Sequence, residues 1–180
     1  MRRRDAASVP HAMLTKNDFS ATDWSTLRDT PYLVGLATML AEPSGLGTIK
    51  ESIAIAVGIA ENQSSDIPLI RDLSSRPEMD AAQASLRGRF AGSQGGPFKE
   101  TVQDLALSQA RSSIELLSGR ASADELNAWR KMLYQLADKV ANASREGGVL
   151  GFGGKAVSDA EQKFLDQLQD AIQLERARRA

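Results

Sequence analysis

Apolar residues along this chain recur mostly at steps of three and four, the spacing of one face of an α-helix. The clearest run follows Glu125 and predicts a helix over 123–145. A second run begins at Val102, and a third follows Ser158. The strict alternation typical of half-buried strands is rare, so the pattern predicts an all-α fold. The apolar positions of the three runs are Leu126, Trp129, Met132, Leu133, Leu136, Ala137, Val140 and Ala141; Val102, Leu105, Ala106, Ala110, Ile114 and Leu117; and Phe164, Leu165, Leu168, Ala171 and Ile172.

Capping boxes mark three of the helix starts. In a capping box a hydroxyl accepts a hydrogen bond from the third helical amide, and a carboxylate three residues on returns to the amide of the cap. The pairs are Thr48 with Glu51, Ser122 with Glu125, and Ser158 with Glu161. Proline suits the first helical position, so Thr30-Pro31 and Arg76-Pro77 predict two further starts. We expect helices at about 21–29, 31–42, 48–62, 67–74, 77–90, 98–118, 123–145 and 159–178.

These helices are expected to pack as one compact bundle of about seven or eight helices. A chain of 180 residues with 42% hydrophobic content is long and apolar enough for a single core. Residues 1–17 show no periodicity and are predicted to be a flexible N-terminal arm. The remaining 18–180 form one helical domain, with halves 18–90 and 98–180 joined by the Gly/Ser/Pro-rich connector 91–97.

The segment SREGGVLGFGGKAVSDAEQKF, residues 144–164, has the glycines and the lysine of a phosphate-binding loop. A P-loop follows a strand, and its lysine is followed by Ser or Thr, whereas Lys155 is followed by Ala156 and the preceding element is predicted to be a helix. We therefore interpret the segment as a connection between two helices. Its apolar residues Val149, Leu150 and Phe152 would be costly in water, so they are expected to dock on the core of the chain or on a partner.

Two parts of the chain, 33–60 and 133–172, share a helix, a glycine-containing loop and a helix that opens with a capping box. This repetition suggests a duplicated hairpin, with chance similarity of leucine and alanine as the alternative. The matched residues are Leu33, Leu36, Ala37, Ala41 and Ser44 with Leu133, Leu136, Ala137, Ala141 and Ser144.

The same arrangement, with the second helix opening on SDAEQKFL, resembles the tellurite-resistance TerB-like family of all-helical domains. The resemblance implies a compact bundle that binds a divalent metal in stress-response assemblies. The carboxylates that it places near the loops are Glu42, Glu51, Glu146 and Glu161. The aspartate-glycine expected at the turn is absent, because EPSG and EGGVLGFGG stand there. Without a metal, Glu51 and Glu161 are explained as capping residues. No other cofactor is expected.

The composition of the chain excludes several classes of function. The net charge of −1 gives no basic surface for specific nucleic-acid binding over the whole chain. The absence of cysteine excludes disulfides and thiolate sites. His11 is the only histidine and lies in the predicted arm, so histidine-based triads and Glu-x-x-His metal pairs are not expected. The sequence leans toward a non-catalytic protein without settling the point.

Both ends of the chain are basic. If they lie together, they form a patch for an anionic partner, whether a membrane surface, nucleic acid or an acidic protein; otherwise they are a solvated tail and a helix-end cap. Uncharged stretches are shorter than the roughly 20 residues of a membrane span, and no apolar run of a secretory signal follows the first arginines. We therefore expect a cytoplasmic protein. The basic residues are Arg2, Arg3 and Arg4, and Arg176, Arg178 and Arg179.

Three functions remain open at this point. The leading hypothesis is a non-catalytic scaffold or accessory subunit that acts through contacts with an unidentified protein, using Val149, Leu150 and Phe152 together with Arg2, Arg3 and Arg4. The second is a TerB-like metal-binding stress protein. The third is an enzyme that uses carboxylates in a cavity, which would require a deep pocket with perturbed acids.

Overall fold

A computed structural model describes residues 12–41, 48–92, 98–143 and 157–174, and the side chains of 48–51 are not described. The described residues are all-α and contain no strand, as the sequence predicted. The helices are α1 (Ala21–Ala41), α2 (Thr48–Ala60), α3 (Pro68–Leu73), α4 (Arg76–Arg89), α5 (Phe98–Leu117), α6 (Ala123–Ala143) and α7 (Asp159–Ala171), with the short 3₁₀ helices η1 (Lys16–Asp18) and η2 (Glu61–Ser64).

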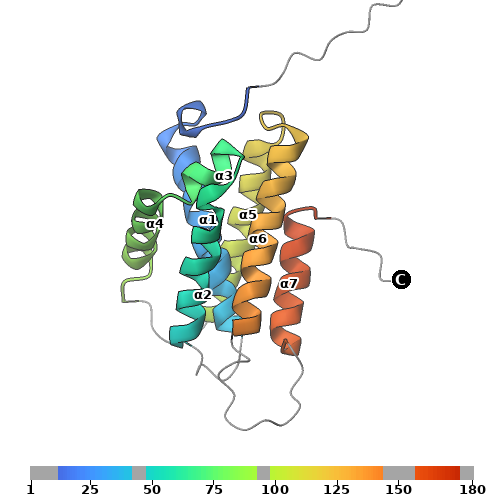
Figure 1. Ribbon diagram of the computed structural model, residues 1–180. Helices are drawn as coiled ribbons and strands as arrows, with labels where there is room; N and C mark the ends of the chain where they lie inside the picture. The colour runs from blue at the N-terminus through green and yellow to red at the C-terminus, as the bar shows by residue number, and fades with distance from the viewer. Residues whose placement is uncertain (1–11, 42–47, 93–97, 144–156, 175–180) are drawn as a thin grey trace, which may run out of the picture.

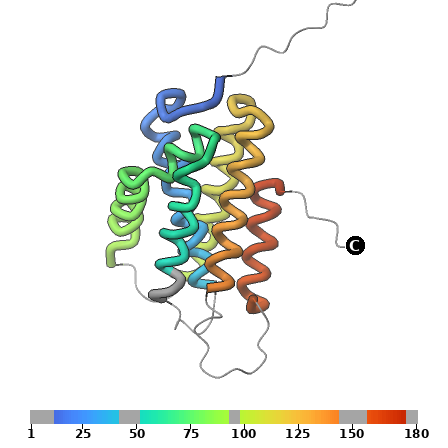
Figure 2. The backbone as a smooth tube through the Cα atoms, in the orientation of Figure 1, coloured from blue at the N-terminus to red at the C-terminus, as the bar shows by residue number. Residues whose placement is uncertain are grey.

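Helix α1 is the centre of the bundle. It contacts α2, α4, α5, α6 and α7, and α2 also lies along α6 (Figure 1). Helix α4 stands at the edge and packs chiefly against α1 (Figures 1 and 2). Among the described residues, no helix is long and apolar enough to cross a bilayer.

The core lies where the apolar stripes of α1, α5, α6 and α7 meet. Trp129 is fully buried, and its indole Nε1 donates to Ser113 Oγ at 2.9 Å, so the ring is buried without an unsatisfied donor. The other largest fully buried side chains come from six helices and confirm the helical faces that the pattern indicated. They are Phe164, Leu27, Leu33, Ile59, Leu69, Ile114, Leu117, Leu133, Leu165, Leu168 and Ile172.

Two glycines let α2 approach its neighbours closely. A Cβ atom at Gly35 of α1 would lie 2.7 Å from Ile55 Cγ1, and one at Gly58 of α2 would lie 2.7 Å from Leu136 Cδ1 of α6. Real Cβ atoms do not come so near to other heavy atoms, so the helix spacing depends on these glycines. Helix α2 is thereby held between α1 and α6.

The predicted break between 21–29 and 31–42 is wrong, because α1 continues through Pro31. Proline removes one backbone donor and strains the preceding turn. The carbonyl that loses its helical donor is Leu27 O, and the carbonyl one residue earlier, Thr26 O, accepts from Thr30 Oγ1 at 2.6 Å and from Gln109 Nε2 of α5 at 3.1 Å. Packing against α5 therefore stabilises one helix where the dipeptide suggested two.

Two predicted helix starts are seen in detail. At Ser158 and at Ser122, the hydroxyl accepts from the amide three residues on, while the glutamate returns to the amide of the serine. Helix α4 begins with proline near its start, as Arg76-Pro77 predicted. The box of Thr48 with Glu51 lies outside the described side chains.

Helix α7 is shorter than the predicted 159–178. It ends at Ala171, because Gln173 turns into the left-handed region with φ 54° and Leu174 N bonds back to Gln169 O at 3.0 Å. Arg130 Nε of α6 donates to Ile172 O at 2.9 Å and satisfies one carbonyl of this end. Residues 175–180 lie outside the described residues.

Part of the segment expected to be an unpacked arm is packed on the bundle. Leu14 is buried, and its amide donates to Glu125 Oε1 at 2.5 Å, so residues 12–20 lie across the end of the bundle near the start of α6 (Figure 2). Thr15 and Asp18 add a local turn, with Thr15 N donating to Asp18 Oδ2 at 2.8 Å. The expectation of an arm is thus wrong for residues 12–17, while residues 1–11 lie outside the described part.

The two proposed hairpins correspond to two pairs of helices in contact, α1 with α2 and α6 with α7. The glycine loops that would be equivalent, and the connector 91–97 apart from its first two residues, lie outside the described residues. The duplication therefore stays a prediction.

Candidate functional site

Most residues predicted to bind a metal or a partner lie outside the described part of the chain. This holds for Glu42, for the side chain of Glu51, and for Glu146, and also for Arg2, Arg3, Arg4, Val149, Leu150 and Phe152. The roles assigned to these residues stay predictions. The exception is Glu161, whose surroundings the structure gives.

Glu161 is 2% exposed and occupies a structural position. Its Oε2 accepts from Ser158 N at 2.8 Å, and its own amide donates to Ser158 Oγ at 3.2 Å. The carboxylate is thus engaged by the capping box that opens α7. Among the described residues, no three His, Cys, Asp or Glu side chains converge as a cation would require. The divalent-cation site implied by the resemblance stays a prediction.

The candidate site that the described residues do form is an apolar groove of about 520 Å³ between α1, α2 and α4, with Phe98 of α5 at one end. We call it the α4 groove. A volume of this size is in the range of ligand-binding sites. The lining residues are Tyr32, Leu36 and Met39 from α1; Ser52 and Ile55 from α2; Gln83, Leu86 and Arg87 from α4; and Phe90 and Phe98.

Helical periodicity builds the two long walls of the α4 groove. In α1, Tyr32, Leu36 and Met39 stand at i, i+4 and i+7, so they line one face. The second wall has the same spacing, because Gln83 of α4 and Phe90, just after the helix, stand at i and i+7. Leu36, Met39, Phe90 and Phe98 are only partly buried, because no other described side chain covers them.

The end of the α4 groove beside Phe98 is shaped by an aromatic pair. The Phe90 and Phe98 rings meet edge to face, with centroids 5.5 Å apart. Such pairs hold ring positions more firmly than area burial alone. Lys99 Nζ donates to Ala41 O at 2.9 Å and links the start of α5 to the end of α1. These contacts place the two rings, although the residues between 92 and 98 are not described.

The polar groups of the α4 groove are few. Gln83 Nε2 donates to Tyr32 Oη at 3.2 Å, and burial raises the pKa of Tyr32, so the phenol stays neutral at physiological pH. Arg87 is exposed at the rim, and its Nε makes a long contact of 3.4 Å with the Gln83 carbonyl of the same helix. Within the described part of the chain, Arg87 forms no ion pair of the kind seen for Arg28 or Arg76.

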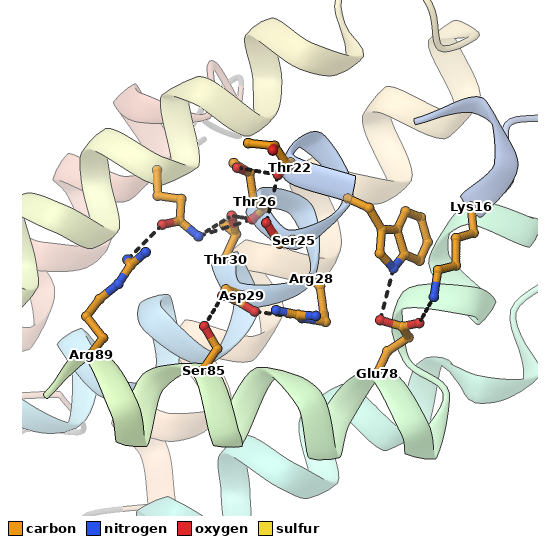
Figure 3. A network of polar contacts seen from close by, with 12 residues as sticks. Lys16, Thr22, Ser25, Thr26, Arg28, Asp29, Thr30, Glu78, Ser85 and Arg89 are labelled. Atoms are coloured by element: carbon orange, nitrogen blue, oxygen red, sulfur yellow. Dashed lines mark hydrogen bonds and ion pairs between the residues drawn. The ribbon is translucent and has the colours of Figure 1, made fainter. Parts of the chain in front are cut away.

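Polar contacts fasten α4 to α1 and to the segment before it (Figure 3). Glu78 is buried and accepts from Lys16 Nζ at 2.6 Å and from Trp24 Nε1 at 2.9 Å. Burial alone would raise the pKa of Glu78, but these two hydrogen bonds and the charges of Lys16 and Arg28 hold the pKa below its usual value. The carboxylate is therefore ionised at neutral pH.

A second polar attachment lies seven residues further along α4, about two helical turns nearer the groove. Buried Asp29 of α1 accepts from Ser85 Oγ of α4 at 2.6 Å through Oδ2 and from Arg28 Nε at 2.8 Å through Oδ1 (Figure 3). Arg89 extends the network by donating to Gln109 Oε1 of α5 at 3.3 Å. Helix α4, which forms one wall of the α4 groove, is thus positioned by charged and hydroxyl groups as well as by apolar packing.

Another exposed apolar surface lies on the outer side of α2. Ile53 is 57% exposed and Val57 43% exposed, four residues apart on one face. Neither residue lines the α4 groove. The groove gathers more apolar side chains around one volume than this pair does, so it is the better candidate site.

Sequence reasoning missed the α4 groove because its walls come from four separate stretches. One signal was available. The run PYLVGLATMLA is apolar around most of its circumference, more than the single face that a surface helix buries. Neither a known protein family, nor a curated protein, nor a solved structure matches this chain. The chemistry of the lining residues therefore carries the functional interpretation.

Proposed function

We propose that this protein is a non-catalytic scaffold or accessory subunit that binds another protein in the α4 groove. The observation that carries the proposal is the row of partly buried apolar side chains, Leu36, Met39, Phe90 and Phe98, along an open groove. A partner that covered them would remove apolar area from water, which stabilises a complex by about 25 cal/mol per Å² before the costs of association.

The lining residues suit binding better than catalysis. Among the described residues, they include one guanidinium, one neutral phenol, one amide and one hydroxyl, and no carboxylate or imidazole that could act as a general base. The proposal keeps Val149, Leu150, Phe152 and the arginines at positions 2–4 as further contact residues. It also includes a cytoplasmic location, which the lack of cysteine fits.

Site-specific photo-crosslinking in cells tests the proposal. The photoreactive residue p-benzoylphenylalanine is placed at position 39 in the groove and, as a control, at position 57 on the outer face of α2. We expect a discrete protein adduct from position 39 alone, and we expect Arg87→Glu in the same chain to remove it. If position 39 gives no adduct, or gives the same adducts as position 57 whatever residue stands at 87, the proposal is wrong.

A further inference from the structure

We infer that the α4 groove receives an amphipathic α-helix of the partner protein, with an acidic side chain beside its apolar face that pairs with Arg87. This inference rests on the proposed function and names the kind of partner. Three features of the described residues support it: the spacing of the walls, the openness of the groove, and the charge at its rim.

The side chains along the two walls of the α4 groove have a spacing that matches the anchor residues of a docked helix. Tyr32 and Met39 on α1, and Gln83 on α4 and Phe90 just after it, are each separated by seven residue steps. At 1.5 Å per residue, each wall is about 10 Å long, or two helical turns. Helices that dock in grooves supply anchors at i, i+4 and i+7 over the same length. The hydrogen bond between Gln83 and Tyr32 ties the two walls together at one end.

The openness of the groove favours a ligand with two unlike faces. Ser52 and Arg87 at the rim are exposed, and Leu36, Met39 and Phe90 are only partly buried. A ligand lying here would bury one side and keep the other in water. An amphipathic helix meets both conditions, whereas an acyl chain would leave apolar surface exposed.

The positive charge of Arg87 at the rim favours an acidic residue beside the apolar face of the partner helix. Two other basic side chains near α4 have carboxylate partners: Lys16 pairs with Glu78, and Arg76 pairs with Asp80. Arg89 of α4 instead donates to the amide oxygen of Gln109. Arg87 has none among the described residues, and its guanidinium presents the fork that accepts a carboxylate through two hydrogen bonds. An acidic residue on the partner would complete this pair, and a basic one would be repelled.

Fluorescence anisotropy with two designed peptides tests the inference. Both are fluorescein-labelled helical peptides of about four turns with leucines at i, i+4 and i+7, and a glutamate flanks the leucines in one where a lysine stands in the other. We expect the intact protein to bind the glutamate peptide about fivefold more tightly than the lysine peptide. Arg87→Glu should reverse this order. Because Arg87 is exposed and its hydrogen bond is to a carbonyl of its own helix, that variant is expected to fold normally.

Matched variants distinguish binding in the α4 groove from nonspecific binding to exposed apolar surface. Leu36→Asp should weaken binding of both peptides at least about tenfold, while Val57→Asp, which removes an exposed apolar side chain outside the groove, should leave it unchanged. Circular dichroism of each variant shows whether it folds. If Leu36→Asp unfolds, the reversal of peptide preference in Arg87→Glu still decides the inference.

The outcomes also separate this inference from the proposed function. If cross-links form at position 39 but neither peptide binds, a protein occupies the groove and the helix is the wrong partner. Peptide binding that is indifferent to the residue at 87 overturns the acidic pairing. Binding of palmitate in place of both peptides, or self-association that Leu36→Asp abolishes, would show that the occupant is an acyl chain or a second copy of this chain, and would overturn the inference.

Discussion

Glutamate residues in this protein show how a carboxylate can be buried for structural reasons. Glu125 and Glu161 are 0% and 2% exposed and close the capping boxes of α6 and α7. Glu125 does more than a capping residue requires, because its Oε1 also accepts from Leu14 N and fixes the N-terminal segment. Buried charges are tolerated where hydrogen bonds satisfy them, and these are.

The first prediction concerns Glu78. Its pKa is lowered in the folded state, so its ionised form stabilises the fold above the pKa of the unfolded chain, and this contribution is lost as the pH falls through the lowered value. Glu78→Gln should lower the free energy of unfolding by about 1–2 kcal/mol at pH 7. The difference from the parent protein should shrink as the pH falls below about 4.3, the usual pKa of an unfolded glutamate, because the folded state then begins to lose the advantage of holding Glu78 ionised. Urea unfolding at pH 7 and pH 3.5 measures both; an equal difference at the two pH values would contradict the assigned role.

The second prediction compares two glycines in helices. Gly35→Ala should destabilise the fold by about 1–3 kcal/mol, because the added methyl group meets the buried, branched side chain of Ile55. Gly88→Ala on α4 is the matched control, since nothing lies within 4 Å of the added atom. It should stabilise by about 0.5–1 kcal/mol through lower backbone entropy in the unfolded chain. Thermal unfolding of the two variants checks the opposite signs, and a stabilised Gly35→Ala would show that α1 and α2 are not held so closely.

Helix α4 is attached to the bundle partly through polar groups. Its buried residues are Glu78, Met79, Ala82 and Leu86, so one of its four inward side chains is charged. Ser85 and Gln83 add polar contacts to α1. Helices held by few apolar contacts open locally at lower free energy than core helices do. The wall of the groove should therefore be the least stable described element after the short α3.

The third prediction follows from that attachment. Ser85→Ala removes the α4 donor to buried Asp29 and leaves one carboxylate oxygen without its partner in α4. Hydrogen exchange followed by mass spectrometry should show lower protection across α4, while α6, which forms much of the core, keeps its protection. A uniform loss of protection over the bundle would mean that α4 does not open independently.

The elements were largely predictable, and the errors have local causes. From residue 48 onward, the predicted helix starts agree with the described ones to within a few residues. Apolar periodicity, the capping boxes and the proline start indicate the same positions there. Pro31 was misinterpreted, because the helix that packs against this part of α1 is α5, which lies far away in sequence and includes Gln109, the donor to Thr26 O. The end of α7 was missed, because Gln173 in the left-handed region carries none of the glycine that usually marks such a stop.

At the scale of the whole molecule, the all-α bundle was predictable and the α4 groove was not. Ser113 and Trp129, or Leu14 and Glu125, meet only in the folded chain, and the groove likewise joins residues around 32–39, 52–55, 83–90 and 98. Periodicity shows that a side chain is apolar and which face it shares. It does not show whether another helix will cover it, and this is what distinguishes Leu36 from Leu33.

The central claim is that the α4 groove is a surface for binding a helix of another protein. Methyl NMR of the protein labelled at Ile, Leu, Val and Met tests it most directly, because the groove and the outer face of α2 both carry methyl groups. On addition of the glutamate peptide, the account predicts saturable shifts of the Leu36, Met39, Ile55 and Leu86 signals, with those of Ile53 and Val57 unchanged. Shifts centred on Ile53 and Val57, or no shifts at all, would contradict it.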